Sequence, residues 1–180
     1  MEVVGFQASP RKNGNCDVLM DEALAAAKAN GADTSKFYLD DLNIEPCHAC
    51  GTCGDGIDCK VQDEGAILLQ EALDADAIIF SSPIYYGQMT AQGKLFTDRF
   101  YSISRNPKKS LEGKKAILIF THGAPDGVYD QYIELTKASP FGHMGMDVVD
   151  VIAAGGIQEP GIIKDNADVM AKSKEAGSKL

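Results

Sequence analysis

The sequence lacks any apolar segment approaching the roughly 20 residues of a transmembrane helix, so it predicts no membrane span. It also lacks a surplus of positive charge. Its 17 Lys and Arg face 26 Asp and Glu, and the net charge of −9 argues against nucleic acid or an anionic membrane as a partner. Neither a G-x-G-x-x-G fingerprint nor a Walker lysine pattern is present, which disfavours dinucleotide and ATP sites.

The composition that remains is ordinary for a globular protein. The chain has 180 residues, 44% hydrophobic and 24% charged, which predicts a single domain over residues 1–180. Met1 leads almost directly into an apolar run, so we expect no signal or transit peptide. We therefore expect a cytoplasmic protein, whose cysteines bind metal or do redox chemistry rather than form disulfides.

Four of the five cysteines fall in one short segment with the spacing C-x2-C-x2-C-x5-C, formed by Cys47, Cys50, Cys53 and Cys59. Such short spacings are typical of ligands to an iron–sulfur cluster, most readily a cubane [4Fe–4S] cluster. Structural zinc is a second interpretation, although zinc sites more often use two separated C-x2-C turns. A loop with free thiols or a disulfide is the third. The spacing favours the cluster.

The rest of the chain alternates strand and helix patterns. Helical spacing over 17–30, 64–73, 90–104 and 164–174, with a weaker helix after Gly127, separates apolar runs. We expect strands at 2–7, about 35–39, 75–82, 115–121 and 147–154, with one irregular insertion at about 40–63. This order predicts a doubly wound α/β fold with a five-stranded parallel sheet, whose ligands bind beyond the carboxyl ends of the strands.

The loop from Ser9 to Cys16 joins the first strand to the first helix, and it has the composition of a phosphate site. Unpaired amides and the dipole at a helix N-terminus favour an anion. Ser9 and Asn15 offer donors, Arg11 offers a charged fork, and Gly14 permits a backbone nest. A polar loop with an ordinary helix cap at Asn15 is the alternative.

A second loop, expected at Pro83 to Gly87, presents two flat, polar-tipped side chains, Tyr85 and Tyr86. They suit stacking on a planar ring, or they simply cap the core. Thr121-His122-Gly123 ends the next strand on the same edge of the sheet. We expect His122 to be a hydrogen-bonded spacer rather than a catalytic residue.

Together these motifs resemble the NADPH-dependent FMN reductase family, which has a flavodoxin-like fold. Residues 9–16, Ser-Pro-Arg-Lys-Asn-Gly-Asn-Cys, resemble its S-P-R-x-x-G-N-[ST] phosphate loop. Residues 82–87 resemble its S-P-x-Y-x-G loop against the flavin ring, and residues 93–99 the helix that follows. The cysteine-rich insertion is similar to that of the iron–sulfur flavoproteins, a branch of this family.

The resemblance implies two cofactors, FMN and a [4Fe–4S] cluster. It implies that FMN is bound by Ser9, Arg11, Asn13, Gly14, Asn15, Cys16, Ser82, Pro83, Ile84, Tyr85, Tyr86, Gly87, Thr121 and Gly123. It also implies a ferredoxin-like electron donor, a small acceptor such as oxygen or peroxide, and a homodimer or homotetramer whose cluster and flavin come from different subunits. No catalytic acid or base is expected among the side chains.

Cys16 departs from the family pattern, which usually has Thr or Ser there. We expect an inert thiol that makes a weak contact to the phosphate. Around the cysteines, Asp55, Asp58, Asp63 and Glu64 outnumber Lys60, which predicts a low cluster potential. Two other functions stay open: an NAD(P)H-dependent FMN or quinone reductase without a cluster, and a non-enzymatic docking module, flavodoxin-like or stapled by zinc.

Overall fold

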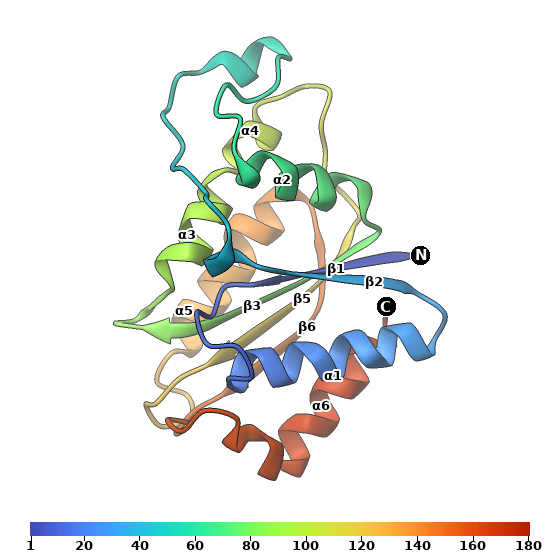
Figure 1. Ribbon diagram of the computed structural model, residues 1–180, viewed down its shortest axis with the longest axis vertical. Helices are drawn as coiled ribbons and strands as arrows, with labels where there is room; N and C mark the ends of the chain where they lie inside the picture. Colours follow the sequence, from blue (N-terminus) through green and yellow to red (C-terminus); the bar gives the residue numbers. More distant parts are fainter.

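The computed structural model describes all residues from Met1 to Leu180 (Figure 1). Its sheet has parallel strands in the order β2-β1-β3-β5-β6, and the short strand β4 pairs antiparallel with β3. The strands are β1 (Glu2–Gln7), β2 (Asp33–Tyr38), β3 (Ala77–Tyr85), β4 (Gln88–Met89), β5 (Lys115–Thr121) and β6 (Asp147–Ala154). The predicted flavodoxin-like, doubly wound parallel sheet is therefore confirmed, with β4 as an addition.

Helices cover both faces of the sheet (Figure 1). They are α1 (Asn15–Ala29), α2 (Glu64–Asp74), α3 (Ala91–Asp98), α4 (Tyr101–Ser104), α5 (Asp130–Thr136) and α6 (Ala167–Ser178). Short helical turns lie at Leu39–Asp41, Thr52–Asp55, Lys137–Phe141, Gly142–Met144 and Ile162–Asp165. No helix is both long and apolar enough to cross a membrane.

Two apolar cores lie on the two faces. On one face, α1 and α6 pack against each other and against the sheet through Leu19, Met20 and Ala176. Gly177 makes this close crossing possible, because a Cβ atom there would lie 2.1 Å from the carbonyl oxygen of Ala23. On the other face, side chains from α2, α3, α4 and α5, including Leu68 and Phe96, pack over the same strands.

Several predicted boundaries were wrong. The strand predicted to end at residue 82 continues through Tyr85, because Ile84 and Tyr85 pair with Met89 and Gln88 of β4 in a hairpin. The helix predicted over 90–104 is divided into α3 and α4, and the last helix begins at Ala167 rather than at residue 164. The predicted strand at residues 115–121 and that at 147–154 are confirmed.

Candidate functional site

A cleft of about 380 Å³ lies at the carboxyl edge of the sheet, at the N-terminus of α1. This volume is in the range of small-molecule sites. The loop after β1, the end of β3 and the loop after β5 all contribute to it. Of the predicted flavin-binding residues, those that line the cleft are Ser9, Arg11, Gly14, Asn15, Cys16, Pro83, Ile84, Tyr85, Thr121 and Gly123.

The floor of the cleft offers unpaired backbone donors. The amides of Asn15, Cys16 and Asp17 open helix α1 and donate to no acceptor within the protein. Gly14 precedes them as the N-cap without a side-chain cap, and a Cβ atom there would lie 2.9 Å from the carbonyl oxygen of Arg11. Free amides at the positive end of a 15-residue helix make a site for an anion such as a phosphate.

Asp17 holds the loop above this floor, although the sequence motif gave no sign of it. Its buried carboxylate accepts the amide of Asn13 at 2.7 Å, the hydroxyl of Tyr38 at 3.0 Å and the ammonium of Lys36 at 2.8 Å. Burial raises the pKa of Asp17, but these three donors outweigh it, so the pKa lies below its usual value. The carboxylate therefore stays ionised and fixes Asn13, whose φ is +59°.

Asn15 does not point its amide at the cleft floor, where a phosphate donor was expected. Its Nδ2 donates to the carbonyl of Glu159 at 2.9 Å, and its Oδ1 accepts the amide of Ile163 at 3.2 Å. This side chain ties the loop after β6 to the start of α1. As a result Ile157, Gln158, Glu159 and Pro160 form a wall of the cleft that sequence motifs did not identify.

Cys16 is buried, with a relative exposure of 1%. Its Sγ lies 3.2 Å from Oγ1 of Thr121, and burial raises the pKa of the thiol to about 11. This environment agrees with the expectation that the Cys16 thiol is inert. Within the protein its side-chain partner is Thr121, on the neighbouring wall of the cleft.

His122 also lines the cleft, and its ring is hydrogen-bonded, as expected from the sequence. Its Nδ1 lies 2.9 Å from the carbonyl oxygen of Ala124, and the ring makes an edge contact with Tyr129 at a centroid distance of 4.9 Å. The carbonyl can only accept, so Nδ1 carries the proton of this hydrogen bond. His122 is buried and held in one orientation.

Four predicted flavin contacts lie outside the cleft lining: Asn13, Ser82, Tyr86 and Gly87. The Ser82 hydroxyl is buried and links β3 to α3, because it accepts the amide of Thr90 at 3.1 Å and donates to the carbonyl of Pro83. Tyr86 is fully exposed at the tip of the β3–β4 hairpin. Both Tyr86 and Gly87 have positive φ, as the central residues of a two-residue type I′ turn require.

The cysteine loop lies elsewhere, beside α4 and beyond the N-terminus of α2, at the opposite end of the view from the start of α1 (Figure 1). Cys53 is buried, Cys47 and Cys59 are half-buried, and Cys50 is exposed. Thiols of this number and spacing suit iron. In this structure, however, no three His, Cys, Asp or Glu side chains come together closely enough to hold a metal ion.

Cations from distant positions of the chain reach the loop. Lys109 pairs with Asp58 at 2.8 Å, and Nζ of Lys108 donates to the carbonyl of Gly56 at 3.0 Å. The buried guanidinium of Arg99 pairs with Asp63. The predicted acidic excess counted only sequence neighbours of the cysteines, and these three cations offset it.

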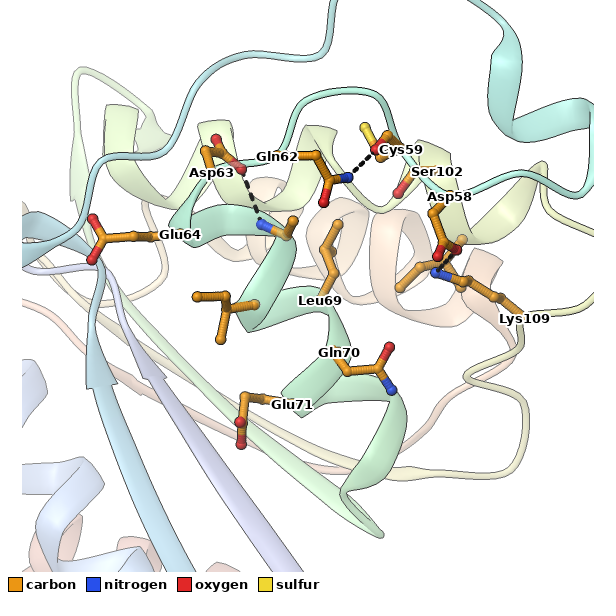
Figure 2. A pocket seen from close by; sticks show the side chains of 13 residues that line it. Asp58, Cys59, Gln62, Asp63, Glu64, Leu69, Gln70, Glu71, Ser102 and Lys109 are labelled. Atoms are coloured by element: carbon orange, nitrogen blue, oxygen red, sulfur yellow. Dashed lines mark hydrogen bonds and ion pairs between the residues drawn. The ribbon is translucent and has the colours of Figure 1, made fainter.

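A groove of about 670 Å³ runs along the base of the cysteine loop, between α2 and α4 (Figure 2). Asp63 caps α2 there by accepting the amide of Ala66 at 3.0 Å, and Asp58 and Lys109 pair at the other end. Cys59 is among the residues that line this groove. None of the four cysteines of the cysteine loop lines the cleft at the carboxyl edge, so in one chain the two features share no cavity.

Comparison with known proteins places these features in a family. The model of the NADPH-dependent FMN reductase family matches residues 1–155. An iron–sulfur flavoprotein of Methanosarcina thermophila is 31% identical over 134 residues, covering 74% of this chain and 70% of that protein. An iron–sulfur flavoprotein of Archaeoglobus fulgidus is 31% identical over 183 residues, covering 100% of this chain and 79% of that protein.

A solved structure supports the fold independently. An FMN-dependent NADH-azoreductase from Bacillus anthracis, in complex with FMN, superposes with a TM-score of 0.74 over 100% of this chain and 99% of its own, at 15% identity. The family match covers most of the chain and includes the motifs that line the cleft. The chain therefore belongs to the NADPH-dependent FMN reductase family, in the branch of the iron–sulfur flavoproteins, and is a flavin-dependent oxidoreductase.

Proposed function

We propose that this chain is an electron-transfer iron–sulfur flavoprotein. It passes electrons between a ferredoxin-like carrier, a [4Fe–4S] cluster and FMN, and on to a small acceptor such as oxygen or peroxide. A cluster exchanges one electron at a time and a flavin one or two, so the pair of cofactors joins one-electron to two-electron chemistry. The side chains bind and orient these groups, and none is assigned as a catalytic acid or base.

The observation that carries the FMN assignment is the set of unpaired amides at the floor of the cleft. The N–H groups of Asn15, Cys16 and Asp17 have no acceptor in the protein, and a phosphate would supply one. Arg11 lines the same cleft and adds a positive charge. These features support FMN with its phosphate on the N-terminus of α1.

The ring of the flavin would lie toward the end of β3. Pro83, Ile84 and Tyr85 form that wall, and Thr121 and Gly123 form the wall next to the start of α1. Tyr85 is partly exposed and presents an aromatic surface at the mouth of the cleft. Asn13, Ser82, Tyr86 and Gly87 support the site by shaping the loops around it, through the Asp17 contact, the Thr90 contact and the hairpin turn.

We assign Cys47, Cys50, Cys53 and Cys59 as cluster ligands on the basis of their spacing and number. In this structure the thiols are not gathered, so binding requires the loop to draw them together. The separation between this loop and the cleft in one chain supports an assembly of several copies (Figure 1). We propose a homodimer or homotetramer in which the cysteine loop of one copy approaches the flavin of another.

The test is the content of iron, acid-labile sulfide and FMN per chain in protein prepared without oxygen. We expect about one FMN and about four iron and four sulfide per chain, as one cubane cluster contains. Cys50→Ser should lose the broad cluster absorbance and keep FMN, whereas Cys16→Ser, as the matched control, should keep its iron. FMN with no iron in the wild type, even after reconstitution, would reject the cluster.

Two observations favour a second function, an NAD(P)H-dependent FMN or quinone reductase whose cysteines are free or bind zinc. The cysteines do not converge in this structure, and a putative NAD(P)H-dependent FMN-containing oxidoreductase of Bacillus subtilis is 26% identical over 97% of this chain. In that case NADPH should reduce bound FMN at the same rate in the wild type and in Cys50→Ser. The family assignment decides against the third alternative, a non-enzymatic docking module.

A further inference from the structure

We propose that Arg99 is a positioning residue for the cysteine loop. Its guanidinium clamps both ends of the loop and directs an N–H group at Sγ of Cys59. The proposal rests on the proposed function, because it concerns the loop assigned to the cluster. Arg99 follows helix α3, and its side chain is entirely buried. A fully buried guanidinium is retained only where nearly all of its donors have acceptors.

The first observation is that one guanidinium bonds to both ends of the loop. Nη1 donates to the carbonyl of Glu45 at 3.0 Å, two residues before Cys47. Nη2 donates to the carbonyl of Val61 at 2.9 Å, two residues after Cys59. The two ends of the loop are therefore joined through a single planar group.

Asp63 completes the clamp. Its Oδ1 and Oδ2 accept from Nη1 of Arg99 at 3.0 and 2.8 Å. Its carboxylate also accepts the amide of Glu45 at 2.6 Å and caps α2 through the amide of Ala66. Arginine suits this position better than lysine, because its fixed fork of donors reaches several acceptors in one plane.

The second observation is that one edge of the guanidinium faces sulfur and is incompletely bonded. Nη2 lies 3.8 Å from Sγ of Cys59, and Nε is buried with no acceptor. These two nitrogens share an edge of the planar group. A buried donor without an acceptor costs free energy, so it indicates a missing partner. A thiolate of Cys59 that carries a metal centre would supply the negative charge that this edge lacks.

This contact has a consequence for the cluster. A cation and a hydrogen bond beside a ligand sulfur stabilise the more negative, reduced state, so they raise the reduction potential. Arg99 therefore acts on the reduction potential in the opposite direction to the carboxylates around the loop. Its contribution is specific to the cluster, because Arg99 does not line the cleft where FMN is proposed to bind.

The test compares Arg99→Lys, which keeps the charge and loses the fork, with Arg105→Met, an exposed arginine nearby on the same segment, as the control. In iron-free protein, alkylation of each cysteine by iodoacetamide is followed by mass spectrometry, with exposed Cys50 as the internal reference. We expect the rate at Cys59 relative to Cys50 to rise about tenfold in Arg99→Lys, because the loop opens more often. An unchanged ratio would overturn the clamp.

In protein loaded with iron, the midpoint potential of the cluster is measured by redox titration with electron paramagnetic resonance. We expect a lower cluster potential in Arg99→Lys and an unchanged FMN potential. A cluster potential equal to that of the wild type would overturn the contact to Cys59.

The variant Asp63→Asn guards against a folding defect in the Arg99 variant. It should raise the Cys59 alkylation ratio while Arg99 remains in place, and an unchanged ratio in this variant would also overturn the clamp. A wild type that binds no iron would reject the proposed function, while the alkylation ratio would still decide whether Arg99 clamps the loop.

Discussion

The carboxylate of Asp17, on the first turn of α1, accepts the amide of Asn13 at 2.7 Å and so fixes the loop that precedes its own helix. Lys36 and Tyr38 of β2 hold the same carboxylate. The loop around the proposed phosphate site is thus anchored by a buried acid that does not itself line the cleft.

Asp17→Asn should lower the free energy of unfolding by about 1–3 kcal/mol near neutral pH, because one or more buried donors lose a charged acceptor. It should also weaken FMN binding, since Asn13 is no longer fixed. Chemical denaturation and FMN titration measure the two effects. An Asp21→Asn variant is the control, because Asp21 is exposed and also pairs with Lys36. Equal effects of the two variants would contradict the assigned role of Asp17.

The same carboxylate predicts a pH dependence. The folded-state pKa of Asp17 is depressed, so its contribution to stability is present above the ordinary aspartate pKa of about 3.9 and is lost as the pH falls through the folded-state value. Between neutral pH and about pH 2, the wild type should lose more stability than Asp17→Asn. Parallel curves of unfolding free energy against pH would refute this.

Much of the fold was predictable because the central strands are continuous apolar runs. The strand at Lys115–Thr121 is an example. The extension of β3 through Pro83 to Tyr85 was not predictable, because a segment that begins with Pro, contains two Tyr and ends with Gly is typical of a loop. The chain continues as a strand there because a two-residue turn brings β4 back onto it.

The proposed phosphate loop was predicted from its sequence, but the partners of its side chains were not. Asn15 bonds to Glu159 and Ile163, which lie more than 140 residues away. Arg99 reaches the cysteine loop from the end of α3, and this changes the charge around the cysteines. No local pattern encodes such pairs, because they depend on how the helices and loops pack around the finished sheet.

Asn15→Ala should loosen the wall of the cleft formed by residues 157–160. The variant loses two hydrogen bonds, so we expect a loss of about 1–2 kcal/mol in stability and weaker FMN binding. Hydrogen exchange measured by mass spectrometry should rise in residues 157–163 and stay constant in β1. Unchanged exchange at 157–163 would contradict the assigned link.

Cys16 should be unreactive in the native protein. Its burial and a thiol pKa of about 11 leave little thiolate at pH 8. In iron-free protein, iodoacetamide should modify exposed Cys50 well before Cys16, as peptide mass spectrometry can measure. Cys16→Ser should retain FMN, because Thr121 can still pair with the new hydroxyl and the backbone amide is unchanged. Rapid modification of Cys16 would refute its buried environment.

Tyr86 has a φ of +50° and a fully exposed side chain, a strained conformation with no packing to offset it in one chain. Tyr86→Asn should therefore raise stability by up to about 1 kcal/mol, since Asn tolerates positive φ better. If this aromatic ring contacts a flavin or a second copy, the same variant should weaken FMN binding or assembly. Thermal unfolding, FMN titration and sedimentation measure these effects. Lower stability in the free chain would contradict the strain.

The central claim is that electrons enter through the cysteine loop and leave through the cleft. The most direct measurement is the rate at which bound FMN is reduced anaerobically by a reduced ferredoxin, compared with NADPH, in the wild type and in Cys50→Ser. We predict rapid reduction by ferredoxin in the wild type, a large loss of that rate in Cys50→Ser, and slow reduction by NADPH in both. Equal reduction by ferredoxin in the two proteins, or rapid reduction by NADPH in both, would contradict the account.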